Sequence, residues 1–183
     1  MTEHPLKYEG VFVTKGYIMS DTIKLKSVVL EDFVNYKKPS MFIGTCTCTF
    51  KCCTEKGYDV SICQNSSLAN QPSKDIDISY LYDKYSNNKI TKAIVIGGLE
   101  PFLQFEEVKS LINYFRAKGC QDDFVIYTGY TESEIESNML WKSIYDFDNI
   151  VIKYGRYVQG DKPHYDEELG VYLVSDNQYA KRY

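Results

Sequence analysis

The sequence predicts an α/β fold, in which helices cover a layered sheet of parallel strands. Two patterns in the 183 residues carry this prediction. Short runs of apolar residues recur along the chain, and segments with helical apolar spacing lie between them. These runs are continuous rather than alternating with polar residues, which is typical of strands buried on both faces of a parallel sheet. The alternation of strands and helices therefore indicates repeated βαβ units with right-handed crossovers.

Apolar runs define the predicted strands, and a different kind of segment precedes them. The core runs are residues 41–44, 93–96, 124–127 and 150–152, and residues 171–174 are the predicted last strand. Near the amino terminus, short apolar runs at 11–13 and 23–30 are broken by glycines, which favours short strands or a hairpin at a sheet edge. We therefore divide the chain into an N-terminal β extension, residues 1–38, and a core domain, residues 39–183.

Three segments have the features of helices. Apolar and aromatic residues recur at i, i+3, i+4 and i+7 within residues 78–85 and again within residues 108–115. Gly119 follows the second segment and predicts its end. A third helix is predicted to begin at Thr131, because Thr131 and Glu134 have the spacing of a capping box.

The composition argues against two classes of function. The formal net charge is −4 and the isoelectric point is about 5.3, which argues against a dedicated nucleic-acid-binding protein. The chain has no apolar run of the roughly 20 residues that a transmembrane helix needs. Its amino terminus lacks the basic and apolar regions of a signal peptide. We therefore expect a cytoplasmic protein that binds neither nucleic acid nor membrane.

The cysteines are concentrated in one place. Five of the six follow the first core run directly: Cys46, Cys48, Cys52, Cys53 and Cys63. A secreted disulfide scaffold would instead spread its cysteines along the chain. In α/β proteins, reactive groups gather at the carboxyl ends of strands, where this group falls. Thiolates are the usual ligands of iron–sulfur clusters, and a set of only three leaves one iron open to a substrate.

The spacing of these cysteines resembles the signature of the radical SAM superfamily. Cys48 and Cys52 match the first half of its Cys-x3-Cys-x2-Cys motif. Cys63 matches the third cysteine, because Asn65 stands two residues later, as in the activating-enzyme branch, and Ile62 precedes it where an aromatic residue is common. Ten residues separate Cys52 from Cys63 instead of two, so we interpret this segment as an expanded cluster loop.

Two further motifs follow the next core runs. Residues 97–101, Gly-Gly-Leu-Glu-Pro, resemble the superfamily's Gly-Gly-Glu-Pro motif with one leucine inserted. Residues 127–131, Tyr-Thr-Gly-Tyr-Thr, and the ending at 175–178 are similar to the activating enzymes of anaerobic ribonucleotide reductase. The resemblance extends from about residue 35 to about residue 180. Each motif alone is a weak or moderate signal, but three in order at the ends of successive predicted strands are a strong one.

The resemblance implies a shortened, open (β/α) half-barrel with parallel strands and a particular set of site residues. Cys48, Cys52 and Cys63 are the implied ligands of a [4Fe-4S] cluster, which leaves Cys46 and Cys53 as extra cysteines. The second implied cofactor is S-adenosylmethionine, with Ile62, Asn65, Gly97, Gly98, Glu100, Pro101, Thr128 and Gly129 as its binding residues. Glycines permit close backbone approach, and a carboxylate suits the ammonium of the methionine part.

An activity and two partners follow from the same resemblance. The family cleaves S-adenosylmethionine reductively to a 5′-deoxyadenosyl radical, with an electron from a donor such as flavodoxin. In the glycyl-radical-enzyme activating branch, the radical takes a hydrogen from a glycine of a large partner enzyme. The implied partner is the anaerobic ribonucleotide reductase.

Two other interpretations stay open. Residues 97–104 also resemble 7-carboxy-7-deazaguanine synthase, a radical SAM enzyme that acts on a small molecule. A different class is a binding module without catalysis, stabilised by zinc on four of the cysteines. Lys153 and Arg156 follow the fourth core run, and the sequence allows each a place in the crevice or on the solvated surface.

Overall fold

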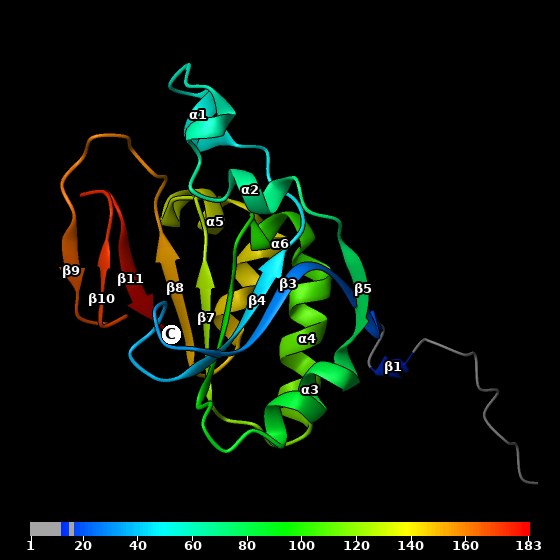
Figure 1. Ribbon diagram of the computed structural model, residues 1–183. Coiled ribbons are helices and arrows are strands. Elements are labelled where there is room, and N and C mark those ends of the chain that lie inside the picture. Colours follow the sequence, from blue (N-terminus) through cyan, green and yellow to red (C-terminus); the bar gives the residue numbers. More distant parts are fainter. Residues whose placement is uncertain (1–11, 15–16) are drawn as a thin grey trace, which may run out of the picture.

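Figure 1 shows the computed structural model of the protein, which describes residues 12–14 and 17–183. The strands of the central sheet are β3 (Thr22–Asp32), β4 (Ser40–Thr45), β5 (Lys74–Asp77), β6 (Ala93–Gly97), β7 (Asp123–Tyr127), β8 (Ile150–Tyr154) and β11 (Tyr179–Arg182). Within the described residues they form one seven-stranded sheet in the spatial order β11–β8–β7–β6–β4–β3–β5. The predicted α/β class is confirmed.

The centre of this sheet is parallel and its edges are antiparallel. β4, β6, β7 and β8 are parallel neighbours and correspond to the four predicted core runs. β3, β5 and β11 are each antiparallel to the strands they pair with, so the sheet as a whole is mixed. The short connection at residues 33–39 explains the antiparallel β3–β4 pair, since a parallel crossover needs a dozen residues or more.

The three predicted helices are present as α3 (Ile78–Ser86), α4 (Phe105–Ala117) and α5 (Glu132–Ser137). The capping box of α5 is formed: the amide of Glu134 donates to Thr131 Oγ1 at 3.3 Å, and the amide of Thr131 donates to Glu134 Oε2 at 2.9 Å. Gly119 has a φ of +84° and ends α4 as predicted. Shorter helical segments are α1 (Lys51–Thr54), α2 (Ser66–Ala69), α6 (Met139–Lys142), η1 (Val60–Ile62), η2 (Pro101–Gln104) and η3 (Ser143–Asp146).

The central strands separate two apolar layers. Ile94 and Ile96 belong to the larger layer, together with the apolar residues of α3 and α4, which lie on one side of the sheet in Figure 1. Val95 points the other way and packs in a smaller layer with Tyr36 and Leu173. The strands are therefore buried on both faces, as their unbroken apolar runs predicted. The face opposite α3 and α4 is covered by loops and strands rather than by long helices.

The carboxyl-terminal part differs from the prediction. Residues 171–174 were expected to be the last strand of the domain, but β10 (Val171–Leu173) pairs with β9 (His164–Asp166) in a separate two-stranded hairpin. The last strand of the central sheet is β11, which is antiparallel to β8. An edge strand needs no continuous apolar run, and Tyr179–Arg182 has none, so its pairing was not visible in the sequence.

Part of the predicted N-terminal extension lies outside the described residues, namely 1–11 and 15–16. In the described part, β1 (Phe12–Thr14) and β2 (Tyr17–Met19) form an antiparallel hairpin, and β3 belongs to the central sheet. The division at residue 38 stays a prediction. Among the described residues, no helix combines the length and the apolar character needed to cross a membrane.

Candidate functional site

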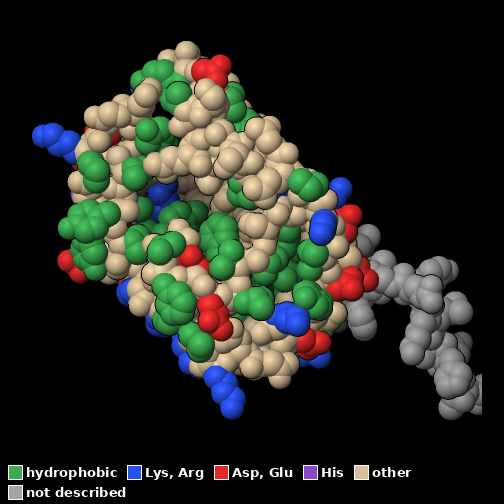
Figure 2. All heavy atoms as spheres, viewed as in Figure 1, with side chains coloured by type: hydrophobic (Ala, Val, Ile, Leu, Met, Phe, Trp, Pro, Cys, Tyr) green, Lys and Arg blue, Asp and Glu red, His purple; other side chains and the backbone are tan. Residues whose placement is uncertain are grey.

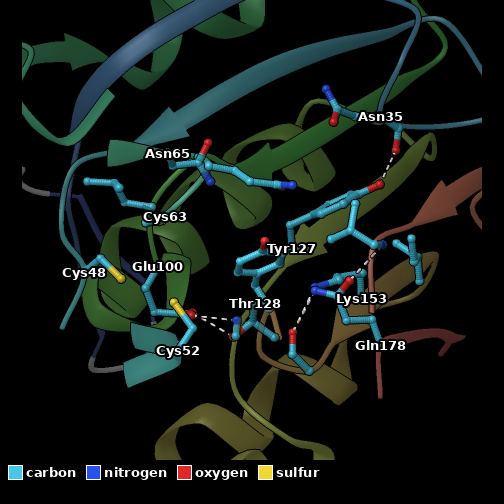
Figure 3. Close-up of a pocket in the computed structure, with 18 of the residues that line it drawn as sticks. Asn35, Cys48, Cys52, Cys63, Asn65, Glu100, Tyr127, Thr128, Lys153 and Gln178 are labelled. Carbon is cyan, nitrogen blue, oxygen red and sulfur yellow. Dashed lines mark hydrogen bonds between the residues drawn. The ribbon is translucent and has the colours of Figure 1, made fainter. Parts of the chain in front are cut away.

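A cavity of about 320 Å³ lies where the parallel strands end. Figure 2 shows a hollow on this face of the molecule, with hydrophobic side chains around it. Figure 3 shows the side chains that enclose the cavity. The predicted site residues among its lining are Cys48, Cys52, Cys63, Asn65, Gly98, Glu100, Thr128 and Gly129. Three predicted residues do not line it: Ile62, Gly97 and Pro101.

The cysteine loop leaves β4 and turns sharply before α1. Phe50 has a φ of 54°, in the left-handed region, and its amide donates to Cys48 Sγ at 3.2 Å. α1 then carries Cys52, which lines the cavity, and Cys53, whose side chain is 0% exposed and does not. The two sulfur atoms are 3.8 Å apart. Adjacent residues of a helical turn point in different directions, and here only Cys52 points into the cavity.

The expanded segment between Cys52 and Cys63 brings these two residues together. It completes α1, turns at Gly57, which has a φ of +68°, and returns through η1. A hydrogen bond from Cys63 lowers the pKa of Cys52, and the same bond raises the pKa of Cys63. Burial raises the pKa of Cys48 to about 11. The ten residues between Cys52 and Cys63 therefore do not separate the third predicted ligand from the other two.

Cys46 lies at the edge of this region without lining the cavity. Its sulfur is 3.4 Å from Thr47 Oγ1, and its amide donates to Gln104 Oε1 at 2.8 Å. The Gln104 amide in turn donates to the carbonyl of Lys24 at 2.9 Å. These contacts fix the start of the cysteine loop against β3. Cys46 and Cys53 thus stay outside the cavity, as their interpretation as extra cysteines requires.

The two glycines at the end of β6 have different roles. Gly98 has a φ of +81°, and a Cβ atom there would lie 2.7 Å from Leu68 Cδ2 and 3.2 Å from the Cα of Gly44. Only glycine fits this position without strain or displacement. Gly97 lies in the strand, where its carbonyl accepts a hydrogen bond from Thr45 Oγ1 at 2.9 Å. Its predicted role as a ligand residue stays a prediction, and in the structure it lies within the strand beside Tyr127.

Glu100 is the buried acid of the site, with 6% of its surface exposed. Thr128 Oγ1 donates to its Oε1 at 2.7 Å, and the amide of Gly129 donates to its Oε2 at 2.9 Å. Burial raises the pKa of Glu100 to about 7, although these hydrogen bonds oppose the rise. Pro101 does not line the cavity: it begins η2, where a proline without an amide hydrogen is well tolerated.

Of the other predicted residues, some line the cavity and some do not. Asn65 lines the cavity and precedes α2. Ile62 is half-buried in η1 and does not line the cavity, so its binding role stays a prediction. From the predicted C-terminal motif, Gln178 lines the cavity, whereas Asn177 donates to the carbonyl of Arg156 at 3.0 Å.

Several lining residues were not predicted from the sequence. Tyr127 and Lys153 are cross-strand partners at the ends of β7 and β8, and both line the cavity. Each stands two residues after a valine of the smaller apolar layer, Val125 and Val151. The two-residue period of a strand was the signal that places them on this face. Further unpredicted parts of the wall come from the β3–β4 connection and from the β9–β10 hairpin with the residue after it: Val34, Asn35 and residues 171–174.

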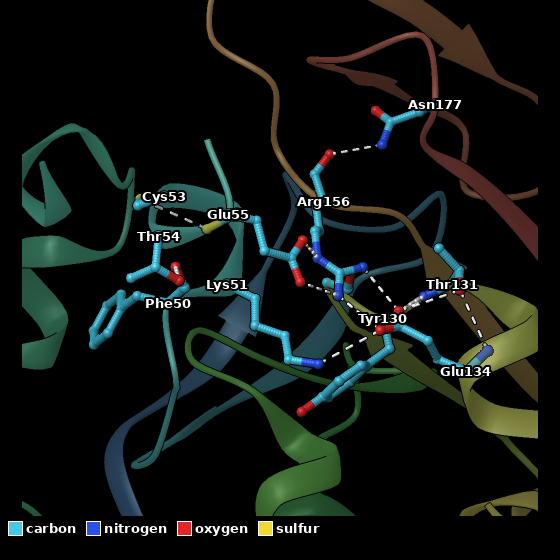
Figure 4. Close-up of polar contacts among 12 residues, drawn as sticks. Phe50, Lys51, Cys53, Thr54, Glu55, Tyr130, Thr131, Glu134, Arg156 and Asn177 are labelled. Atoms are coloured by element: carbon cyan, nitrogen blue, oxygen red, sulfur yellow. Dashed lines mark hydrogen bonds and ion pairs between the residues drawn. The ribbon is translucent and has the colours of Figure 1, made fainter. Parts of the chain in front are cut away.

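Arg156 fastens the cysteine loop to the rest of the molecule (Figure 4). Its guanidinium donates to both carboxylate oxygens of Glu134, each at 2.8 Å. Its Nε lies 2.8 Å from Glu55 Oε2. Glu55 belongs to the segment between Cys52 and Cys63, whereas Glu134 caps α5. Through these two contacts, Arg156 joins the expanded segment to the turn after β7.

The donor set has the chemistry of an iron–sulfur cluster site, because thiolates are its usual ligands. Within residues 12–14 and 17–183, no group of three His, Cys, Asp or Glu side chains is arranged to hold one metal ion. In a [4Fe-4S] cluster each thiolate binds a different iron, so its ligands surround a cavity instead of meeting at one point. Cys48, Cys52 and Cys63 have such an arrangement, because all three line the same cavity.

A thiol-lined cavity at the carboxyl ends of parallel strands is typical of an α/β protein that binds metal through cysteine. The comparison with known families agrees: the family model described as a 4Fe-4S single cluster domain matches residues 37–178. The chain belongs to this family of iron–sulfur proteins. No curated protein and no solved structure matches the chain.

Proposed function

We propose that the protein is a radical SAM enzyme that binds its [4Fe-4S] cluster through Cys48, Cys52 and Cys63. One observation carries the proposal: the three cysteines line the same cavity as Gly98 and Glu100 of the glycine–acid turn. The three motifs that resemble the superfamily in sequence thus converge in space. When bound, the cluster supplies the single electron that cleaves S-adenosylmethionine to methionine and a 5′-deoxyadenosyl radical.

The protein's own residues bind and orient S-adenosylmethionine and exclude water from the site. Glu100 offers a buried carboxylate to the ammonium of the methionine part, and Thr128 and Gly129 hold that carboxylate in place. The left-handed turn at Gly98 lets the backbone approach the ligand closely. In the proposal, the parallel strands are part of the shortened half-barrel of the superfamily, with the cavity on its inner face.

For the target we propose a glycine of a partner enzyme, the anaerobic ribonucleotide reductase, with a flavodoxin-like protein as electron donor. The cavity opens as a hollow on the surface of the molecule (Figure 2), which suits a target presented from outside. A small-molecule reaction like that of 7-carboxy-7-deazaguanine synthase is the alternative within the same chemistry.

The test is anaerobic reconstitution with iron and sulfide, followed by dithionite and S-adenosylmethionine. We expect 5′-deoxyadenosine from the native protein and from Cys46→Ala, the matched control outside the cavity, but none from Cys63→Ala. An iron–sulfur protein that forms no 5′-deoxyadenosine would refute the activity. A colourless protein that purifies with zinc would instead identify a binding module. For the proposed target, we expect the cluster-loaded native protein with S-adenosylmethionine and reductant to produce a glycyl radical signal in the EPR spectrum of added anaerobic ribonucleotide reductase.

A further inference from the structure

An exposed apolar rim lies at the mouth of the cavity, where Figure 2 shows hydrophobic side chains around the hollow. We define this rim by five residues that are between 46% and 73% exposed: Val29, Phe33, Val34, Tyr165 and Tyr172. Val34 and Tyr172 line the cavity themselves. Tyr165 is the cross-strand partner of Tyr172, and their ring centroids are 5.4 Å apart. Val29 is the cross-strand partner of Phe42, another lining residue, so it lies on the same face of the sheet as the cavity.

Hydrogen bonds hold the rim in this exposed position. The carboxylate of Asp32 accepts a hydrogen bond from the Asn35 amide at 3.1 Å and another from Asn35 Nδ2 at 3.0 Å. These bonds fix a turn whose two central residues both belong to the rim. The β3–β4 connection is in turn joined to the β9–β10 hairpin by the hydrogen bond from the Lys37 amide to the Leu169 carbonyl at 2.7 Å. The two parts of the rim are therefore held beside each other.

The chemistry of the rim indicates what kind of partner covers it. Large contiguous patches of exposed apolar side chains are uncommon on folded proteins and often mark binding surfaces. Among the described residues that line the cavity, the Asp, Glu, Lys and Arg side chains are Glu100 and Lys153, and both are buried. An occupant of the rim therefore meets apolar and aromatic side chains, which favours an uncharged polypeptide over nucleic acid.

The backbone beside the rim suits an extended segment. Among the described residues, β10 pairs with β9 alone, so its other edge has no partner strand. Of these two described strands, β10 lines the cavity and β9 does not. An unpaired edge can take up an extended polypeptide as an added strand, while neighbouring apolar sites bind the side chains of that polypeptide.

We propose that the rim binds an extended, uncharged segment of the target protein, which presents a glycine to the cavity. This inference rests on the proposed function and names the surface that recognises the target. Because Val34 and Tyr172 belong both to the rim and to the cavity wall, a segment bound to the rim also covers the mouth of the cavity. Glycine suits this place, since without a side chain its α-carbon can approach the cavity closely.

The test compares Phe33→Ala and Tyr165→Ala with the native protein, because both residues belong to the rim but not to the cavity wall. The probe is anaerobic ribonucleotide reductase, titrated by calorimetry with the cluster-loaded protein and S-adenosylmethionine. We expect each variant to raise the dissociation constant by about tenfold or more, as loss of a buried aromatic contact predicts, and to lower the glycyl radical signal. The matched control is Tyr80→Ala, at an exposed aromatic residue of α3, which packs on the other face of the sheet.

A second measurement separates the rim from the proposed activity. Without the reductase, dithionite and S-adenosylmethionine should give the same amount of 5′-deoxyadenosine in the native protein and in both rim variants. Loss of this product in the rim variants would overturn the inference, because the rim would then act on the cofactor site. No 5′-deoxyadenosine from the native protein would instead overturn the proposed function.

Three further results would overturn the inference while the proposed activity stands. The first is equal affinity of the native protein and both rim variants for the reductase. The second is a native protein that cleaves S-adenosylmethionine but binds no reductase. The third is self-association of the native protein, measured by sedimentation, that Phe33→Ala abolishes, because it would assign the rim to a second copy of the chain.

Discussion

The amide of Gly129 donates a hydrogen bond to Glu100 Oε2 at 2.9 Å, which joins the turn after β7 to the turn after β6. A second link runs from the amide of Glu100 to the carbonyl of Thr47, on the cysteine loop, at 2.8 Å. Three turns from three neighbouring strands thus meet at one residue, Glu100. The leucine inserted before Glu100 does not displace the acid from the site, because these contacts fix both its backbone and its side chain.

Replacement of Glu100 by glutamine should weaken the binding of S-adenosylmethionine. Glu100→Gln keeps the shape of the side chain but removes the charge that attracts an ammonium. We expect the dissociation constant to rise by about tenfold or more, measured by calorimetry on the cluster-loaded protein. The matched control is Glu106→Gln, an exposed acid in the first turn of α4. Unchanged affinity in Glu100→Gln would remove this residue from the binding site.

The two adjacent cysteines should respond in opposite ways to substitution. Cys52→Ala removes a cavity-lining thiol and should lose most of the iron and sulfide. Cys53→Ala affects a buried side chain outside the cavity, so it should keep the cluster and lower the free energy of unfolding by about 1 kcal/mol. Iron and sulfide analysis after reconstitution, together with urea unfolding, separates the two effects. Loss of the cluster from Cys53→Ala alone would reverse the ligand assignment.

Gly98→Ala should destabilise the fold through both strain and contact. The left-handed φ of +81° costs about 1–3 kcal/mol for a residue with a side chain, and the new Cβ would also approach Leu68 and Gly44. Gly160 is the matched control, because its φ is +77° and a Cβ there would meet nothing within 4 Å. Urea unfolding should show a larger loss for Gly98→Ala than for Gly160→Ala. Equal losses would mean that the close packing at Gly98 has no energetic effect.

The ion pairs of Arg156 should stabilise the cysteine loop more than the whole fold. Glu55→Gln breaks the contact to the loop and leaves the contact to Glu134 intact. Since Glu55 is about half exposed, with 48% of its side chain accessible, we expect a loss of only about 0.5–1 kcal/mol in the free energy of unfolding. Hydrogen exchange at residues 53–62 should nevertheless accelerate, relative to the exposed control Glu167→Gln. Unchanged hydrogen exchange in this segment would show that the ion pair between Glu55 and Arg156 does not stabilise the loop.

Much of the site was predictable because neighbouring parallel strands end on the same edge of a sheet. That rule alone brings the cysteine loop after β4 close to Glu100 after β6 and Thr128 after β7. The apolar runs that define these strands are local features of the sequence. The expanded segment was the uncertain element, and its return to Cys52 depends on a left-handed turn at Gly57 and on the contact between Glu55 and Arg156.

The wall of the cavity was not predictable in the same way. The β9–β10 hairpin covers it through long-range contacts, such as the hydrogen bond from the Lys37 amide to the carbonyl of Leu169 at 2.7 Å. The sequence left Lys153 open between the crevice and the solvated surface, although lysine side chains are rarely buried. The two-residue period of β8 is what places it on the face that carries the cavity. Charged residues at functional sites are exceptions to the rule that charged side chains lie at the surface.

The last prediction concerns acid stability at the other end of the sheet. Asp123, at the start of β7, accepts hydrogen bonds from Arg182 at 2.6 Å and from Lys38 at 2.6 Å. Burial raises the pKa of this carboxyl, but the hydrogen bonds from Arg182, Lys38 and Tyr36 outweigh it and lower the pKa to about 2. A carboxyl with a lowered folded-state pKa stabilises the fold above its unfolded-state pKa of about 4 and loses this effect as the pH falls toward 2.

Asp123→Asn should therefore reduce the free energy of unfolding at pH 7, and the difference from the native protein should vanish between pH 4 and pH 2. Lys38 and Arg182 are 45% and 37% exposed, so solvent screening limits the effect to about 1–2 kcal/mol. Urea unfolding of the cluster-free protein at several pH values measures it, since acid would release iron from both proteins. Asp161→Asn is the control and should show a much smaller difference, because this half-buried loop carboxylate accepts its hydrogen bonds from the backbone amides of Lys162 and Asp176. A difference for Asp123→Asn that is equally large at pH 5 and below pH 2 would contradict the role of the charge, because protonation would then leave the contribution of Asp123 unchanged.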